Sequence, residues 1–279
     1  MCIGVRTADN CYGITLSISN KCFNAKINQV DLWHQQLGHA SHKQLENISK
    51  CDVVIGLPMF EKIEKCIYGP CQIGKQVKSK HSSVTKVQTS RPLELLHIDL
   101  MGPARVQSLG GKKYILVVVD DYTRYTWVVL LRDKVKAPEK MIHLCKKLQV
   151  EKGIVIARIR SDHRREFENT KLATFYNDQG TYQEFSSPKT PQQNGIVERK
   201  NRVVQEMASV MLHNKNMPKS FWGEAINTTC HTLNRVYFRL DSKKTPYELW
   251  RGKKPVVKYF RIFGNDCYIL RDIENLEKR

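Results

Sequence analysis

The stretch LLHIDLMGPARVQSLGGKKYILVVVDDYTRYTWVVLL, residues 95–131, contains three apolar runs separated by turn residues. The runs are residues 95–100, 114–119 and 125–131, and each has the length and apolar content of a β-strand. Three such strands in succession predict a β-meander at the start of a folded domain.

The segments that follow this meander alternate between helix and strand. Helical spacing of apolar residues predicts helices at about 139–151 and 170–178, after residue 195, and at about 221–234. Short apolar runs predict strands at 155–160 and 181–185. A meander followed by alternating elements indicates an α/β fold in which helices flank a mixed sheet.

Three acidic residues stand where a divalent-metal nuclease needs carboxylates. Asp99 and Asp162 each follow an apolar run, so both are expected at strand ends. Glu198 follows the breaker-rich residues 191–195 and is expected on the first turn of a helix. Two Mg²⁺ or Mn²⁺ ions held by such acids can drive in-line phosphoryl displacement. A single strand-end Asp is usually a turn or cap residue, so the prediction depends on the combination.

The composition favours a polyanionic partner. The chain has 279 residues and a formal net charge of +19 spread along its length, which favours nucleic acid over the alternative of a merely well-solvated basic surface. Nine cysteines without regular spacing argue against a secreted disulfide scaffold. The longest aliphatic run, residues 115–119, is too short to span a bilayer, and the amino terminus lacks a signal pattern. We therefore expect an intracellular protein without a membrane partner.

Six motifs carry more specific information than the composition. They are LWHQQLGH (32–39), CQIGK (71–75), HIDLMGP (97–103), VDDYTR (119–124), IRSD (159–162) and TPQQNGIVERKNR (190–202). Together they resemble the integrase region of a Ty1/copia-type retrotransposon Pol polyprotein, and the match runs across nearly the whole chain. The first two motifs are similar to the family's pre-integrase zinc module, and the others to its catalytic-core signatures.

This resemblance implies an RNase H-like fold with a mixed five-stranded sheet, preceded by a small helical His/Cys zinc module. The family's catalytic, metal-binding acids fall on Asp99, Asp162 and Glu198, and 35 residues separate the last two, which is the family's characteristic gap. The resemblance also implies processing of DNA 3′ ends followed by strand transfer into target DNA. It further implies a homo-oligomer, and a nuclear location when the protein is functional.

We expect five segments along the chain. Residues 1–30 are an N-terminal extension that resembles a remnant of upstream polyprotein, and residues 31–77 are the pre-integrase zinc module. Residues 78–92 form a basic linker, and residues 93–240 form the integrase catalytic core. Residues 241–279 are expected to be the start of a truncated post-core region.

The expected zinc module has two suitable histidines and an altered pair of cysteines. His34 and His39 are expected on one helical face, with Cys71 as a further ligand. Tyr68 stands where the family has its first Cys, so Cys66, two residues earlier, is the candidate fourth ligand. We expect weak Zn²⁺ binding, because zinc affinity falls steeply if only three ligands close. Since the binding energy of such a module is largely its folding energy, residues 31–75 would then be loosely folded. The alternative is that the two histidines are ordinary helix-surface residues.

Arg164 is a second departure, because the family has glycine at this position. A long cationic side chain there restricts the backbone after Asp162 and stands near the metals. The sequence therefore leaves three alternatives open: a working integrase fragment, a catalytically inactive DNA-binding relic of such an integrase, and an RNase H-like nuclease without integration activity.

Basic and polar residues around Glu198 are the candidates for DNA binding. Arg202 lies one turn beyond Glu198 and can hold a phosphate near the metals or, alternatively, form a helix ion pair with Glu198. Asp120 and Asp121 are attributed to a hairpin turn and not to metal binding. Gln193 and Asn194 are either base or sugar contacts, or turn formers and caps. The full candidate set is Lys189, Gln193, Asn194, Arg199, Lys200 and Arg202.

Overall fold

A computed structural model describes residues 4–6, 12–14, 29–60, 70–71, 89–163, 166–185, 191–239 and 242–266 of the chain. Among the residues singled out above, Cys66, Tyr68, Arg164 and Lys189 lie outside these ranges. Two short strands, β1 (Gly4–Arg6) and β2 (Tyr12–Ile14), pair antiparallel ahead of the main body of the fold.

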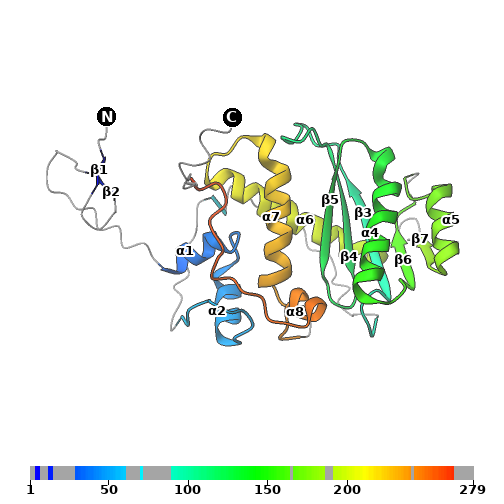
Figure 1. Ribbon diagram of the computed structural model, residues 1–279, viewed down its shortest axis with the longest axis horizontal. Helices are drawn as coiled ribbons and strands as arrows, with labels where there is room; N and C mark the ends of the chain where they lie inside the picture. The colour runs from blue at the N-terminus through cyan, green and yellow to red at the C-terminus, as the bar shows by residue number, and fades with distance from the viewer. Residues whose placement is uncertain are drawn as a thin grey trace.

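The centre of the fold is a five-stranded sheet (Figure 1). Its strands are β3 (Leu95–Met101), β4 (Tyr114–Asp120), β5 (Thr126–Leu131), β6 (Arg158–Ser161) and β7 (Tyr182–Phe185). They lie in the order β5-β4-β3-β6-β7, and β6 and β7 run parallel to β3 whereas β4 and β5 alternate in direction. The predicted meander, the mixed sheet and the RNase H-like class are therefore confirmed.

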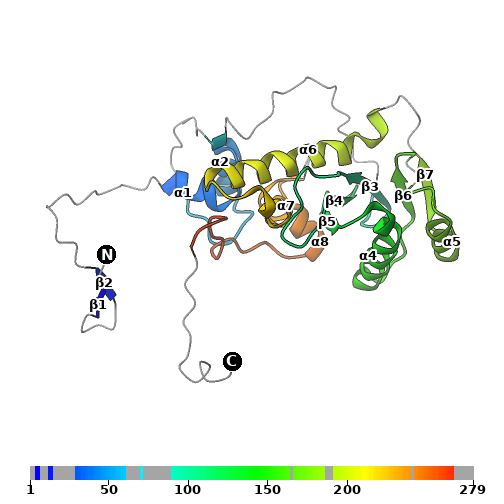
Figure 2. The ribbon, with the colours of Figure 1, turned by 90° about the horizontal axis from the view of Figure 1, so that it is seen from above.

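Two pairs of helices cover the two faces of the sheet, as the view from above in Figure 2 makes plain. Helices α4 (Ala137–Lys152) and α5 (Thr170–Gln179) pack on one face. Helices α6 (Pro191–Asn214) and α7 (Trp222–Val236) pack on the other. The sheet is thus buried on both sides, which explains the nearly continuous apolar runs of its central strands.

Five shorter elements complete the described fold. They are α1 (Gln29–Gln36), α2 (His42–Lys50), α8 (Pro246–Arg251) and the 3₁₀ turns η1 (Lys134–Lys136) and η2 (Lys219–Phe221). Within the described ranges, no helix combines the length and the apolar character that a membrane crossing requires.

The side chains of β3 alternate between the two helical layers, because successive strand residues face opposite sides of a sheet. Leu96, Ile98 and Leu100 enter the core beneath α4 and α5. His97 and Asp99 occupy the alternate positions and face the side covered by α6. Asp99 is therefore turned toward the helix that carries Glu198, although it lies inside β3 and not at its end as predicted.

The observed start of α6 corrects the sequence prediction. The helix begins at Pro191, so residues 191–195 form its first turn instead of a breaker-rich loop, and Glu198 lies about two turns into the helix. Proline is favoured at the first helical position, where its missing N–H costs no hydrogen bond. Strand β6 also starts three residues later than predicted, because its pairing with β3 begins at Arg158.

The helical module formed by α1 and α2 packs directly against the core. A Cβ at Gly38, which follows α1, would lie 2.5 Å from Met211 Cε on α6. Gln44 Nε2 on α2 donates a hydrogen bond of 2.9 Å to the carbonyl of Val236 at the end of α7. The backbone of Ile55 pairs with residues 255–257 beyond α8. The module is therefore held by both α6 and α7 and by the chain that follows α8.

Candidate metal and nucleic-acid site

Asp99 lies inside β3, two residues before its end, and Asp162 directly follows the neighbouring parallel strand β6. The paired register of the two strands ends with His97 opposite Arg160, and continuing it by two residues brings Asp99 level with Asp162. Asp99 is buried and Asp162 is half-buried. Because adjacent strands are only about 4.8 Å apart, both carboxylates are within reach of a shared metal centre.

Helix α6 brings the third acid to the same end of the sheet. Asn201 Nδ2 donates a hydrogen bond of 2.6 Å to Asp99 Oδ2, which places this turn of α6 directly over β3. Glu198 lies three residues earlier on the helix and is solvent-exposed. Residues three apart are neighbours on one helical face. Asp99, Asp162 and Glu198 therefore come from two neighbouring strands and the helix above them, although among the described residues their carboxylates are not grouped closely enough to enclose one ion.

Asn201 is a site residue that the sequence analysis did not identify. The available signal was its spacing, because a residue three positions after Glu198 must share its helical face. The side chain is buried, and its Oδ1 has no hydrogen-bond partner among the described residues. Such an oxygen is an open acceptor for a metal-bound water, which suits a site that holds a hydrated divalent cation.

The backbone also holds Asp99 in place. Its Oδ1 accepts a hydrogen bond of 2.8 Å from the backbone N–H of Leu100, while Oδ2 accepts from Asn201. Carboxylate oxygens held in this way on rigid elements are the ligands that Mg²⁺ and Mn²⁺ prefer. The chemistry of this carboxylate therefore suits a divalent cation.

Ionisable residues lie two positions before the acids on the same strands, His97 before Asp99 and Arg160 before Asp162. His97 of β3 is opposite Arg160 of β6, whose Nη2 lies 2.8 Å from Glu184 of β7. Burial is the main cause that lowers the pKa of His97, while its contact with Asp121 acts in the opposite direction. The strand positions beside the acids therefore carry the ion pair of Arg160 with Glu184 and a buried histidine.

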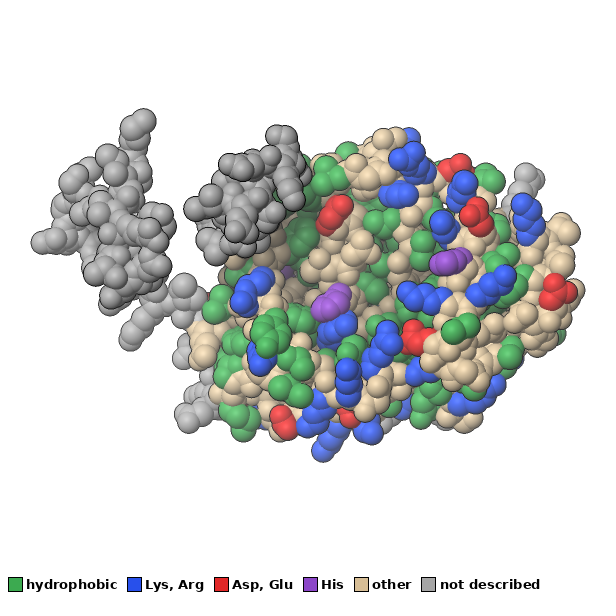
Figure 3. All heavy atoms as spheres, viewed as in Figure 1, with side chains coloured by type: hydrophobic (Ala, Val, Ile, Leu, Met, Phe, Trp, Pro, Cys, Tyr) green, Lys and Arg blue, Asp and Glu red, His purple; other side chains and the backbone are tan. Residues whose placement is uncertain are grey.

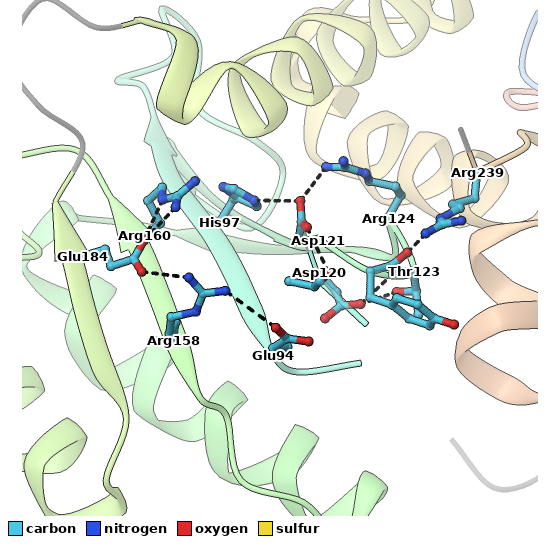
Figure 4. Close-up of polar contacts among 12 residues, drawn as sticks. Glu94, His97, Asp120, Asp121, Thr123, Arg124, Arg158, Arg160, Glu184 and Arg239 are labelled. Carbon is cyan, nitrogen blue, oxygen red and sulfur yellow. Dashed lines mark hydrogen bonds and ion pairs between the residues drawn. The ribbon is translucent and has the colours of Figure 1, made fainter. Parts of the chain in front are cut away.

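Asp121 is buried and contacts three separate segments, so it is more than a hairpin-turn residue (Figure 4). Its Oδ1 lies 3.2 Å from His97 Nε2 and 3.1 Å from Arg124 Nη1, and its Oδ2 accepts a hydrogen bond of 2.9 Å from Thr89 Oγ1. Asp120 does close the hairpin turn as expected, because its carboxylate accepts from the backbone of Thr123 at 2.8 Å. The carboxylate of Asp121 thus ties the segment that leads into β3, β3 itself and the β4–β5 turn together.

Replacing Asp121 by Ala is expected to lower the free energy of unfolding by about 3–5 kcal/mol, because it leaves the buried Arg124 charge without its ion-pair partner. Urea unfolding followed by circular dichroism measures this change. The matched control is Glu139→Gln, since Glu139 is exposed and its ion pair with Lys136 at 3.9 Å contributes little. Equal stabilities for the two variants would refute the role given to Asp121.

A second candidate metal site lies in the helical module. His34 Nε2 is 3.2 Å from His39 Nδ1, and Cys71 Sγ is 3.3 Å and 3.6 Å from these two atoms. Tetrahedral zinc with Zn–N of about 2.0–2.1 Å and Zn–S of about 2.3 Å sets ligand separations of about 3.3–3.6 Å. All three residues are buried. The triangle of ligand atoms therefore fits one face of a zinc tetrahedron.

The orientation of His34 also suits zinc. Its Nδ1 lies 2.7 Å from the carbonyl oxygen of Ala40, so Nδ1–H can donate there and leave the Nε2 lone pair facing the cluster. The spacing had suggested that the two histidines share one helical face, and this prediction is wrong. Helix α1 ends at Gln36, and Gly38 and His39 both adopt left-handed backbone conformations, with φ of 64° and 62°. This turn brings the His39 ring back onto His34.

The candidate DNA-binding residues separate into two groups. Arg199 and Arg202 are exposed on α6, and no ion pair joins Arg202 to Glu198 among the residues that the structure describes. Lys200 is half-buried, and burial lowers its pKa to about 8. Gln193 and Asn194 lie in the first turn of α6. Only Arg199 and Arg202 are therefore placed as open phosphate contacts in this part of the helix.

Basic side chains are not confined to α6. Figure 3 shows Lys and Arg side chains distributed over the whole face seen in Figure 1, with fewer Asp and Glu side chains among them. This distribution agrees with the spread of positive charge along the sequence. It provides a broad surface of the sign that a polyanion requires.

Two family models match the chain. The integrase core domain matches residues 89–191, and the GAG-pre-integrase domain matches residues 10–76. The retrovirus-related Pol polyprotein from transposon TNT 1-94 of Nicotiana tabacum is 33% identical over 237 residues, which are 84% of this chain and 17% of that protein. The Pol polyprotein from transposon RE2 of Arabidopsis thaliana is 28% identical over 85% of this chain and 16% of its own length. The chain thus spans about a sixth of the length of these relatives.

Solved structures of retroviral integrases are also similar. The HTLV-2 integrase catalytic core domain in complex with magnesium has 19% identity and a TM-score of 0.44, and the similarity covers 57% of this chain and 97% of that one. A chain of the simian T-cell lymphotropic virus intasome in complex with PP2A regulatory subunit B56 gamma has 14% identity and a TM-score of 0.48, covering 71% and 66%.

Proposed function

Because the chain belongs to the integrase region of Ty1/copia-type retrotransposon Pol polyproteins, we propose that it carries out metal-dependent processing of DNA 3′ ends and strand transfer into target DNA. The observation that carries this proposal is the position of Asp99 opposite Asp162 under the turn of α6 that bears Glu198 and Asn201. Three carboxylates from separate rigid elements are what a two-metal phosphoryl transfer needs.

The proposed chemistry is two in-line displacements at phosphorus. When bound, the two Mg²⁺ or Mn²⁺ ions activate the attacking oxygen and stabilise the leaving oxygen. Asp99, Asp162 and Glu198 would hold the metal ions, and Asn201 fixes the carboxylate of Asp99. In the first step a water oxygen bonds to phosphorus near the DNA end, the P–O3′ bond breaks, and the leaving 3′ oxygen takes up a proton to become a free 3′-hydroxyl. In the second, that hydroxyl attacks a target phosphodiester and displaces its 3′ oxygen, without a covalent protein intermediate.

The proposed partners are the DNA ends of the element and target DNA, held through phosphates by Arg199 and Arg202 together with basic residues elsewhere on the surface. We also propose a homo-oligomer, since two DNA ends and a target must be held at once. An active enzyme would work in the nucleus, where target DNA lies.

Zinc in the helical module would act as a structural ion, for which His34, His39 and Cys71 offer three ligands.

A second candidate function is a DNA-binding relic without catalysis. The observation behind it is Arg164, two residues after Asp162, at a position where the family has glycine. An RNase H-like nuclease without integration activity is the third. DNA affinity separates none of these, because all three would bind DNA.

The deciding experiment is a strand-transfer assay with Mn²⁺ and an end-mimicking duplex, which compares the unmodified chain with Arg164→Gly. Joining by the unmodified chain supports the integrase, and joining by Arg164→Gly alone supports the relic. Hydrolysis without joining supports the nuclease. Failure of both proteins to bind the duplex would contradict all three.

Asn201→Ala is expected to weaken Mn²⁺ binding or reduce the reaction rate by about 10–100-fold, as for other residues that orient metal ligands. Isothermal titration with Mn²⁺ and the joining assay measure the two effects. The control is Gln205→Ala. Gln205 lies one turn further along α6 than Asn201, and its Nε2 contacts Met101 Sδ at 3.2 Å instead of an acid. Equal effects of the two substitutions would contradict a specific role for Asn201.

Arg202→Ala is expected to weaken DNA binding for all sequences and to reduce the slope of log K against log salt by about 1, the value for one lost phosphate contact. Fluorescence anisotropy across a salt series measures this slope. Lys147→Ala is the control, because Lys147 is exposed on α4, on the opposite face of the sheet. A slope unchanged by Arg202→Ala would remove Arg202 from the DNA contact.

A further inference from the structure

The zinc cluster described above supplies three ligands, whereas a structural zinc site is closed by four. His34 and His39 provide nitrogen, and Cys71 provides sulfur. The sequence resemblance pointed to Cys66 for the fourth position because Tyr68 replaces the family's first Cys. The described residues contain a different candidate at this cluster, a histidine that belongs to neither motif.

His42 is the first residue of α2, and its side chain is only 14% exposed. Its Nε2 is buried and has no hydrogen-bond partner among the described residues. The nearest carboxylate oxygen paired with it, Oδ1 of Asp31, is 3.9 Å away, too far for a hydrogen bond. A buried imidazole nitrogen without a partner is costly, and coordination of a metal is one way to satisfy it.

The ring of His42 lies where a co-ligand of His34 should lie. The ring centroids of His34 and His42 are 5.4 Å apart, close to the 4.9 Å that separates His34 from His39. Two imidazoles that bind one tetrahedral zinc ion at about 2.0–2.1 Å have ring centres about 5 Å apart. The distances from His34 to each of the other two rings therefore match those between imidazoles that share one ion.

We propose that His42 is the fourth zinc ligand of this chain, so that the site is built from three histidines and the single thiolate of Cys71. The three ligand atoms already grouped lie within 4.8 Å of one another, and His42 is outside that group. Coordination therefore requires the His42 ring to turn about its χ2 torsion, which is broad for imidazoles.

This proposal rests on the zinc site of the module and not on DNA joining, so the two can fail independently. Its chemistry also differs from a site closed by Cys66. One thiolate and three neutral imidazoles leave a net charge of +1 on the zinc complex, whereas two thiolates and two imidazoles would leave it neutral. The number of sulfur ligands therefore discriminates between the two arrangements.

The test is titration of the full chain with Co²⁺ followed by Zn²⁺ competition. Tetrahedral Co²⁺ absorbs in the visible region, and its near-ultraviolet charge-transfer band grows with the number of thiolate ligands. The variants are His42→Ala and Cys66→Ser, with His143→Ala as control, because His143 is exposed on α4. We expect a band for one thiolate that Cys66→Ser leaves unchanged, and an affinity for Co²⁺ that falls at least about tenfold in His42→Ala.

The opposite pattern would overturn the proposal: a charge-transfer band that is halved by Cys66→Ser, together with an unchanged affinity in His42→Ala. Absence of tetrahedral Co²⁺ binding by the unmodified chain would overturn it as well. If His42→Ala does not fold, nitrogen-15 NMR of the unmodified chain decides the question. Zinc should then shift the ring nitrogens of three histidines, including His42, and a shift confined to His34 and His39 would reject His42.

Discussion

Asp162→Asn is expected to lower the rate of metal-dependent strand transfer by about 10³-fold or more. A metal ion contributes several kcal/mol of transition-state stabilisation, and each 1.4 kcal/mol corresponds to a factor of ten. Asp162 lies opposite Asp99 on the neighbouring parallel strand, so loss of its charge removes one side of the proposed metal centre. A joining assay in Mn²⁺ measures the rate, and anisotropy verifies that DNA affinity is retained.

The control for this experiment is Asp178→Asn, because Asp178 is exposed on α5, which packs on the opposite face of the sheet. It removes the same charge at a distance from the proposed centre. If Arg164→Gly is needed for joining, both substitutions are made in that background. Strand transfer that survives Asp162→Asn would refute the assignment of the three acids.

Removal of zinc is the second change with a large expected effect. Where free zinc exceeds its dissociation constant a thousandfold, the ion stabilises the folded state by about 4 kcal/mol. The chelated protein is therefore expected to unfold at a lower temperature, and Cys71→Ser should behave like the chelated protein because Cys71 lies 3.3 Å from His34 Nε2. Differential scanning calorimetry with and without a chelator measures both effects.

The destabilisation caused by loss of zinc should extend to helix α6. Gly38 lies between the two histidine ligands and packs against Met211, and Gln44 bonds to Val236 at the end of α7. Hydrogen exchange is therefore expected to rise in residues 29–54 and in the second half of α6, while β3 and β4 keep their protection. A chelator that changes neither the melting temperature nor the exchange pattern, or that acts equally on Cys71→Ser, would contradict a structural zinc ion.

Much of the candidate metal site could be read from local sequence. Asp162 directly follows β6, as its apolar run predicted, whereas Asp99 lies inside β3, which continues to Met101. Glu198 was recognisable by its place in a helical segment, but the helix start was misjudged. Asn194 and Gly195 disfavour a helix locally, whereas Pro191 suits its first position, and packing of α6 against the sheet overrides the unfavourable preference.

Other site residues depend on contacts between distant parts of the chain. Asn201 and Asp99 are 102 residues apart, so their hydrogen bond leaves no local pattern. Asp121 looks like a turn residue until its burial against His97 and Arg124 is seen. Lys200 looks like an ordinary member of a basic cluster, and only its burial sets it apart from Arg199 and Arg202.

The sequence by itself determined the order of strands and helices along the chain and singled out the three acids, and the two histidines with Cys71, as candidates, because apolar periodicity and short motifs are local. The tertiary structure alone decided which of these residues meet. It placed Asp99 beside Asp162 through the parallel pairing of β3 and β6, and it turned His39 back onto His34 through two left-handed residues. Register, burial and chain reversal arise from packing between segments that are distant in sequence, and for that reason no single stretch of the chain encodes them.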